Sequence, residues 1–346
     1  SATGASGPLC EIEFELKSGS MDDLIALARR WVARFHLWLD VRTKADRGDQ
    51  MARRQQTGPV VHACTDSVDL RDKTSADAAL RLMVADCLAH LLPNAAEVAR
   101  DVVVTSEPEH LHQTRVALRR LRSALRNYGA FSSATQASWA IGLKTLFDQL
   151  GAARDRDALE GTVLPALLKA GSPPLDLLVP PPAGDPAAAL RSRACNQLLL
   201  ELIGFAQGAP LDVDAPGLKG QLRQRLRHVH RQLRADADAF PTMNDASRHR
   251  TRKRVKRMRY SVELVAALWR PKAVNGLLDG LRLAQELLGE LNDLMLAERL
   301  CRQRVATDAR IWFALGWIAA RRAALLDQTA VALRQVATAP RFWRRH

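Results

Sequence analysis

A pattern of histidine, threonine and basic residues, eleven residues long, occurs twice in this sequence of 346 residues. The first copy runs from His112 to Arg122 and the second from His249 to Arg259. The His, the Thr and four basic positions match in register. A weaker match follows each copy at nearly the same distance, as a Leu-Gly pair that begins at Leu150 and again at Leu288. Two linked matches in the same order indicate a duplicated structural unit.

The spacing of the basic residues is that of one face of an α-helix. At about 100° per residue, positions 0, 3, 7 and 10 of the pattern lie within about 80° of one another. Apolar residues occupy an adjoining arc, such as Leu118 and Leu121 in the first copy and Val255 and Met258 in the second. Each copy therefore predicts an amphipathic helix with a buried face beside a stripe of cations. The first stripe comprises His112, Arg115, Arg119, Arg122 and Arg126, the second comprises His249, Arg252, Lys256 and Arg259, and Arg120, Lys253 and Arg257 flank them.

These two stripes contain almost no acidic residues. Residues 111–128 include no Asp or Glu, and the second stripe meets only Glu263 at its end. Like charges at these spacings repel by roughly 0.2–0.5 kcal/mol per pair, so the pattern predicts a bound polyanion that relieves the repulsion. We interpret His112 and His249 as phosphate donors at the start of each stripe. A solvated basic surface is the alternative for the stripes, and metal binding is the alternative for the histidines.

Other polar residues near the repeats are weaker candidates. The segment before the second copy supplies Arg223, Arg227 and Arg231 as further polyanion-binding candidates, and a solvated helix face explains them equally well. Asp155 and Asp293 follow the two Leu-Gly pairs, where an Asp either orients an Arg, caps a turn or acts as an acid catalyst. No nucleophile motif, Gly-rich phosphate loop or HExxH pattern accompanies them. We therefore expect no catalytic residue, no metal site and no cofactor.

The composition agrees with a helical protein that binds a polyanion. Lys and Arg number 51 against 37 Asp and Glu, which gives a formal net charge of +14. Arg predominates, and its planar guanidinium group suits phosphate oxygens. The abundance of Ala, Leu and Arg favours an all-α fold. The five cysteines are too scattered to indicate disulfides or a zinc site and suggest a reducing compartment, and no apolar run is long enough to predict a membrane span.

Prolines and a change of pattern divide the chain. Linkers are expected at 171–186 and 207–217, where Pro and Gly gather. Residues 8–57 contain too few elements for an independent domain, so this small α+β region must pack on something else or be a fragment. Its expected elements are a strand at Glu11–Lys17, a helix at Asp22–Phe35, an extended piece at Leu37–Arg42 and a polar stretch at Lys44–Gly58. We therefore expect an N-terminal region at 1–57 (with an expression scar or truncated start at 1–7), a first helical bundle at 58–206 and a second at 207–346.

The paired helices, each followed by a Leu-Gly…Asp segment, resemble the CHAD domain (conserved histidine α-helical domain). The resemblance covers about residues 60–346 and includes Glu109-His-Leu-His112 and Lys256-Arg257-Met-Arg259-Tyr260. It implies two four-helix bundles related by pseudo-symmetry and a basic central pore that binds long-chain inorganic polyphosphate. It also implies a non-enzymatic targeting or organising role, in the cytoplasm at polyphosphate granules.

Residues 8–51 resemble the C-terminal end of a CYTH domain, the triphosphate-tunnel fold. The similar phrases are Glu11-Ile-Glu-Phe-Glu-Leu-Lys17 and Thr43-Lys44-Ala-Asp-Arg47-Gly48. In that family a Glu-x-Glu-x-Lys strand, matched here by Glu13, Glu15 and Lys17, helps hold metal and triphosphate. Most of the strands that close the tunnel are missing from this sequence, so we expect no triphosphatase activity from this chain.

Three functions are compatible with these patterns. The favoured one is polyphosphate binding along both stripes. Nucleic-acid binding also fits the charge, but the stripes lack interleaved aromatic residues for base stacking. Triphosphatase activity would require a complete CYTH domain in a longer chain.

Overall fold

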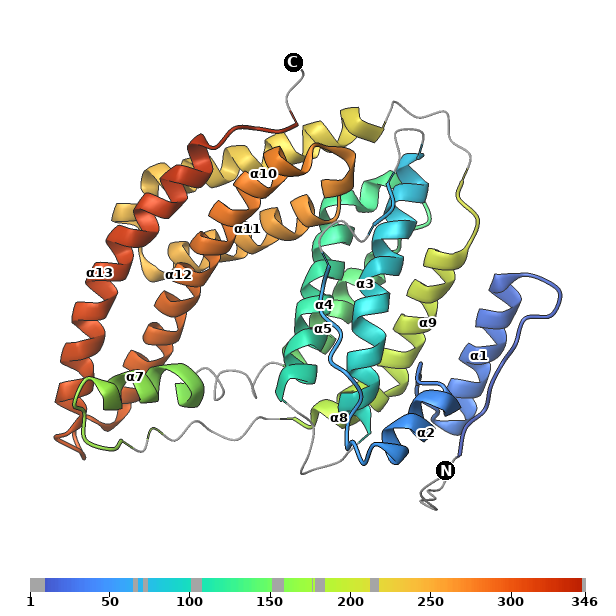
Figure 1. Cartoon of the computed structure of the whole chain (residues 1–346), viewed down its shortest axis with the longest axis horizontal. Helices are drawn as coiled ribbons and strands as arrows, with labels where there is room; N and C mark the ends of the chain where they lie inside the picture. Colours follow the sequence, from blue (N-terminus) through green and yellow to red (C-terminus); the bar gives the residue numbers. More distant parts are fainter. Residues whose placement is uncertain are drawn as a thin grey trace. The chain divides into compact units, whose positions relative to one another are not determined.

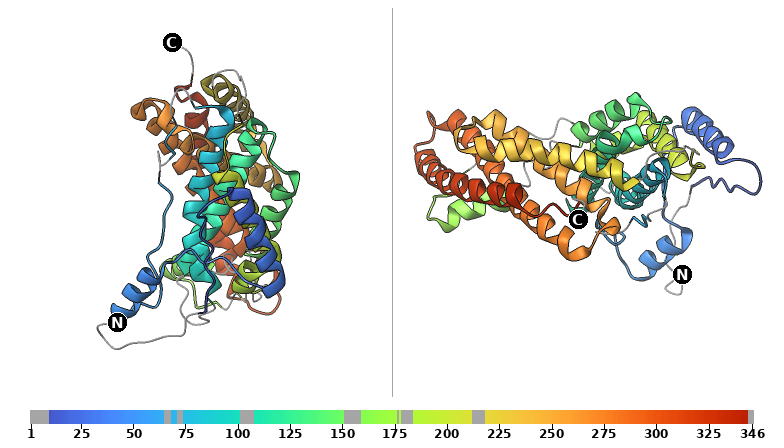
Figure 2. Two further views of the ribbon diagram at one scale, coloured as in Figure 1. Left: turned by 90° about the vertical axis from the view of Figure 1, so that its right-hand side faces the viewer. Right: turned by 90° about the horizontal axis from the view of Figure 1, so that it is seen from above.

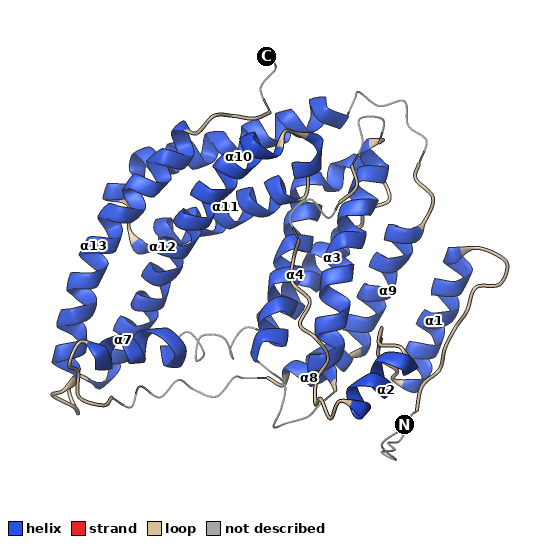
Figure 3. Ribbon diagram, viewed as in Figure 1, coloured by secondary structure: helices blue, strands red, loops and turns tan. Residues whose placement is uncertain are grey.

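The computed structural model describes residues 10–64, 68–70, 74–100, 108–150, 159–175, 177, 184–211 and 218–343. Within these residues the protein is all-α, as predicted, and contains no strand (Figure 3). The α-helices in chain order are α1 (Met21–Phe35), α2 (Lys44–Ala52), α3 (Ala76–Ala99), α4 (Pro108–Tyr128), α5 (Ala137–Gln149), α7 (Leu164–Lys169), α8 (Pro186–Arg191), α9 (Arg193–Gln207), α10 (Leu218–Ala239), α11 (Asp245–Glu263), α12 (Pro271–Arg304) and α13 (Ile311–Thr338). Short helical turns join some of them: η1 (Gly129–Phe131), η2 (Leu159–Val163), η3 (Phe240–Thr242) and η4 (Ala266–Leu268).

The chain divides into two compact units whose boundaries differ from the expected ones. The first unit comprises residues 1–150 and 184–218, and the second comprises residues 151–183 and 219–346. The described residues 10–57 therefore belong to the first unit and do not form a unit of their own. The short elements η2 and α7 belong to the second unit because η2 packs against α12.

Helix α3 is the centre of the first unit. It packs against α4, α8 and α9, and α5 contacts both α4 and α9 (Figure 1). The apolar residues of α3 lie on all of its sides and do not form a single stripe. Leu80, Met83 and Leu91 are fully buried. Among the described residues, α3 is also the one helix long and apolar enough to cross a membrane, but 67% of its apolar window is buried. Such burial on all sides is typical of the core helix of a bundle.

The described part of the N-terminal segment packs against other helices of the first unit, which is one of the two alternatives that the sequence left open. Its predicted helix is α1, which begins with a capping box formed by Ser20 and Asp23 and lies against α9 (Figure 2). Arg29 of α1 reaches Gln197 and Glu201 of α9, at 2.7 Å in each case. This contact joins segments that are far apart in the sequence.

The predicted strand at Glu11–Lys17 is wrong, because these residues form irregular chain and pair with no strand within the described residues. Alternating polar and apolar residues form a strand only where a second strand satisfies the backbone hydrogen bonds. The expected polar stretch after Thr43 is partly helical, since Thr43 and Asp46 form a capping box that starts α2. The described N-terminal region therefore consists of helices and irregular chain, and the prediction of an α+β structure is wrong.

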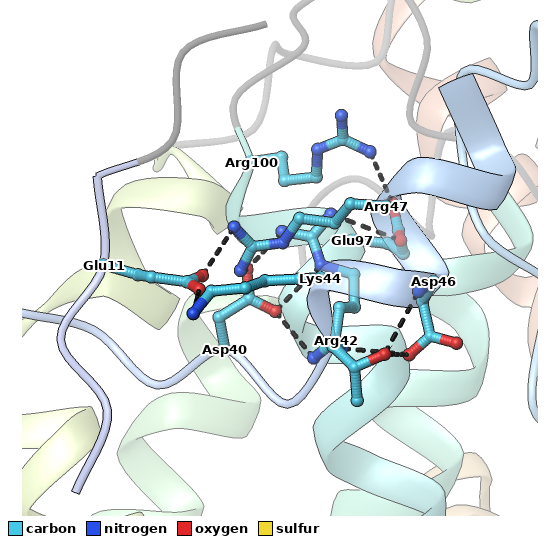
Figure 4. Close-up of polar contacts among 9 residues, drawn as sticks. Glu11, Asp40, Arg42, Lys44, Asp46, Arg47, Glu97 and Arg100 are labelled. Atoms are coloured by element: carbon cyan, nitrogen blue, oxygen red, sulfur yellow. Dashed lines mark hydrogen bonds and ion pairs between the residues drawn. The ribbon is translucent and has the colours of Figure 1, made fainter. Parts of the chain in front are cut away.

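A network of ion pairs holds this N-terminal region at the end of α3 (Figure 4). Arg42 pairs with Asp40 and with Glu97 of α3. Arg47 reaches Asp40 at 3.1 Å and Glu11 at 2.8 Å. Burial opposes ionisation of Asp40, but the hydrogen bonds and charges of Arg42 and Arg47 outweigh it and hold the pKa of Asp40 below its usual value.

Helices α10 to α13 form most of the second unit. Helix α12 is its spine, and α11 and α13 both pack along it (Figure 1). Arg322 of α13 pairs with Asp245 of α11 and with Glu298 of α12, so one guanidinium group connects three helices. After α13 the chain returns to α10, where Trp343 is buried with its ring 5.5 Å from that of His230.

Replacing Arg42 with Ala should lower the free energy of unfolding by about 3 kcal/mol, because Asp40 and Glu97 lose a shared cation in a largely buried site. The stability that Asp40 supplies is complete above its unfolded pKa of 3.8 and is lost as the pH falls through its lower folded pKa. Chemical unfolding of wild type and Arg42→Ala should therefore differ most near pH 7, and the difference should shrink below about pH 4. A difference independent of pH would contradict this account.

Candidate polyanion-binding site

The two copies of the repeated pattern lie on single helices, as predicted. The first copy is on α4 and the second is on α11. In α4 the face formed by Ala117, Leu118, Leu121 and Ala124 is fully buried. The stripe next to it, from His112 to Arg126, becomes more exposed along the helix: Arg115 is buried, His112, Arg119 and Arg122 are half-buried, and Arg126 is exposed.

Three arginines of the α4 stripe surround Phe147 of α5. The guanidinium carbons of Arg115, Arg122 and Arg119 lie 4.4, 5.2 and 5.8 Å from the centre of the phenyl ring. Arg115 also donates a hydrogen bond from Nη1 to the Phe147 carbonyl oxygen at 3.3 Å. Burial and the neighbouring charge of Arg126 lower the pKa of Arg122, although Asp148 opposes this. The cations of α4 are thus gathered around an aromatic ring of the adjoining helix.

Arg120 has a different place from the one predicted. Its side chain is almost completely buried and pairs with Asp86 of α3, with Nη2 2.7 Å from Oδ2. This buried ion pair connects α4 to α3, and the burial of Arg120 leaves almost none of its side chain accessible to an external ligand. Arg120 is therefore a structural residue of the first unit, and its assignment to the polyanion site is corrected.

The second stripe, on α11, is more closely associated with polar partners. His249 lies 3.1 Å through Nδ1 from Oδ1 of Asn292 on α12. A small pocket beside this pair is lined by polar residues of α11, α12 and α13 and by apolar residues of α12 and α13. Its polar lining comprises Asp245, Arg248, His249, Arg252, Asn292 and Arg322. Burial, helped by the charges of Lys253, Arg252 and Lys256, lowers the pKa of His249, whereas the Asn292 contact opposes the shift.

The remaining α11 candidates differ in exposure. Lys253 is exposed, Arg252 and Arg257 are half-buried, and Lys256 is largely buried. Arg259 is half-buried, pairs with Glu263 at 3.4 Å and lies 4.6 Å over the Tyr260 ring. The acid at the end of the second stripe thus contacts one of its cations directly.

Comparison with known proteins places this arrangement in a family. Residues 82–302 match the family model of the CHAD domain. The chain belongs to the CHAD domain family. Its structure is also similar to the "Crystal structure of the CHAD domain from the plant Ricinus communis", with 29% sequence identity and a TM-score of 0.63. The match covers 82% of this chain and 98% of that one. No curated protein matches the sequence.

The family match begins at residue 82, so it does not extend to the CYTH resemblance of residues 8–51, which stays a prediction. In this region Glu13 lies 3.2 Å from Lys44, and Glu11 pairs with Lys44 and Arg47. The two phrases that suggested the resemblance therefore contact each other. Within the described part of the chain, no group of three or more His, Cys, Asp or Glu side chains is placed to hold a metal ion.

The basic residues of α10 divide into two groups in this CHAD domain. Arg227 and Arg231 are exposed. Arg223 is half-buried and donates from Nε to the Trp343 carbonyl oxygen at 3.1 Å, which ties α10 to the end of the chain. Arg223 therefore has a structural contact, which the helical pattern of its segment did not reveal.

Several polar residues of the CHAD domain were not anticipated from the sequence. His110, two residues before His112, is fully buried and contacts Asn94 Oδ1 and the Gly58 carbonyl oxygen, each at 3.1 Å. It fixes the chain before α3 to the bundle. Asn292, which lies in the second Leu-Gly…Asp segment, contacts His249 of the α11 stripe. Asp293, half-buried, contacts Asn292 at 3.4 Å, and Asp155 lies outside the described residues.

Replacing Arg120 with Ala should lower the free energy of unfolding by about 3–5 kcal/mol, because Asp86 is left without its buried cation. Replacing its neighbour Arg119 with Ala should cost less than about 1 kcal/mol, since that side chain is not in the core. Urea unfolding of both variants measures the difference. The double variant Arg120→Met, Asp86→Leu should regain much of the loss, and an Arg120→Ala protein as stable as wild type would contradict the structural role.

Proposed function

We propose that this CHAD domain protein binds inorganic polyphosphate non-covalently along the cationic stripes of α4 and α11 and is not an enzyme. The observation that carries the proposal is the stripe of α4, where His112, Arg115, Arg119, Arg122 and Arg126 adjoin a buried apolar face and no acidic residue lies in residues 111–128. The second stripe repeats the pattern on α11. The proposal includes the basic pore that the family resemblance implies.

Polyphosphate suits these stripes chemically. Every phosphate along the chain carries negative charge, and guanidinium groups form short, charge-assisted hydrogen bonds with phosphate oxygens. Counterions released from the polyanion add to the affinity, which should therefore fall steeply with salt. Two stripes on one chain also favour long polymers, because only a long polyphosphate can occupy both stripes at once.

A cytoplasmic, non-enzymatic role is part of the same proposal. None of the five cysteines forms a disulfide, which supports a reducing compartment. Glu11 and Glu13, two of the acidic residues of the CYTH-like segment, are engaged in ion pairs with Lys44 and Arg47. We infer that the protein targets or organises polyphosphate granules in the cytoplasm.

Removing three stripe cations and one flanking cation should weaken polyphosphate binding by about 100-fold or more and reduce the slope of log affinity against log salt by about 3. The test variant replaces Arg119, Arg126, Arg252 and Lys253 with Ala, because none of these side chains is buried. The matched control replaces four exposed cations outside the stripes, Arg30, Arg53, Lys272 and Arg334, and removes the same charge. Fluorescence polarisation of labelled long-chain polyphosphate measures both, and equal losses in the two variants would contradict a specific site.

Binding should also strengthen as the pH falls through about 6.5, if His249 donates to phosphate. In the ligand-free protein, burial and neighbouring cations hold the pKa of His249 below 6.5. A bound polyanion should raise this pKa because it stabilises the imidazolium form. Proton uptake on binding then increases affinity towards lower pH. The affinity of the His249→Gln variant, measured from pH 8 to pH 5.5, should depend less on pH than that of wild type; parallel curves would remove His249 from the site.

A further inference from the structure

Phe147 is the aromatic residue around which the α4 stripe is arranged. Its side chain lies on α5, is partly exposed, and has the guanidinium groups of Arg115, Arg119 and Arg122 within 5.8 Å of its ring centre. These arginines span two helical turns, about 10.5 Å along α4. A single ring beside the middle of that span can therefore contact all three.

The backbone of the same residue contributes to the arrangement. The carbonyl oxygen of Phe147 accepts the hydrogen bond from Arg115, and the carbonyl oxygen of Arg115 accepts one from Nε of Arg119 at 3.3 Å. The neighbouring carboxylate, Asp148, is hydrogen-bonded to Lys144 at 2.7 Å on the exposed side of α5. Phe147 thus contacts the first arginine through ring and backbone, and the other two through its ring.

An aromatic partner holds an arginine in a different way from a carboxylate. The guanidinium group interacts with the ring through its face, and its N–H donors point outward in its own plane. Stacking therefore orders the cation without cancelling its charge. A carboxylate neutralises the cation and uses in-plane donors, as in the pairs Arg248–Asp245 and Arg259–Glu263 of α11.

We propose that Phe147 is a positioning residue of the polyanion site, which orders Arg115, Arg119 and Arg122 for phosphate. This inference rests on the proposed function. It also distinguishes the two stripes: the residue three positions before the Leu-Gly pair is Phe147 in the first copy and Gln285 in the second. In the first copy an aromatic ring therefore helps to order the stripe before the ligand arrives.

The test compares two substitutions at this position. Phe147→Leu keeps an apolar side chain but removes the aromatic ring, and should weaken binding of labelled long-chain polyphosphate about fivefold. Phe147→Tyr retains the ring and should bind within about twofold of wild type. The matched control is Phe35→Leu, because Phe35 also lies beside an arginine, Arg34 at 5.3 Å, but on α1 and away from the stripes. Phe35→Leu should leave binding unchanged.

Two further measurements separate positioning from a general loss of stability. In a protein that already carries Arg119→Ala and Arg122→Ala, adding Phe147→Leu should change affinity by less than about twofold, because two of the three cations that it orders are gone. In the ligand-free protein, the Nε–H NMR signals of the three arginines should lose their ring-current shifts in Phe147→Leu and keep them in Phe147→Tyr.

The outcomes distinguish this inference from the proposed function. If wild type binds polyphosphate and Phe147→Leu binds equally well, only the role of Phe147 is overturned. Equal losses in the wild-type and double-Ala backgrounds, or in Leu and Tyr variants, overturn it as well. If wild type does not bind polyphosphate at physiological salt, both the proposed function and the role of Phe147 are overturned.

Discussion

Electrostatic repulsion along α4 and α11 is the constraint on which the rest of this structure depends. Cations at helical spacings of three and four destabilise each helix by roughly 0.2–0.5 kcal/mol per pair. Each fully buried Leu contributes roughly 1.5–3 kcal/mol in the opposite direction, and Leu118 and Leu121 of α4, with Val255 and Met258 of α11, are completely buried. The stabilisation from burial therefore exceeds the destabilisation from repulsion, and a folded helix can carry a stripe of cations beside its buried face.

The two helices accommodate this repulsion by different means. In α4 the ring of Phe147 lies close to three guanidinium groups, and Arg120 forms a buried ion pair with Asp86 of α3. In α11 the carboxylates of Asp245 and Glu263 contact Arg248 and the stripe residue Arg259 directly. The duplicated sequence has thus diverged in the way that its cations are held, while the apolar faces have been retained.

The helical faces could be predicted from the sequence because period and polarity are local properties. The same reasoning could have found Arg120: alanines three residues before and four residues after it, Ala117 and Ala124, place it beside the buried face and leave room for a large side chain. The strand at Glu11–Lys17 was mistaken because a strand depends on a partner that the local pattern does not contain. The contacts of Phe147 with the arginines, and of Asn292 with His249, join different helices. Such contacts depend on packing angles that spacing within one segment does not specify.

The central claim is that a polyphosphate chain, and not any polyanion, is the ligand of this CHAD domain. The most direct measurement is displacement of labelled long-chain polyphosphate at about 150 mM salt, where non-specific phosphate contacts are already weak. Duplex DNA is the competitor, at equal phosphate concentration. The account predicts tight binding that DNA does not displace. Weak binding, or ready displacement by DNA, would contradict it and would reduce the stripes to a general polyanion surface.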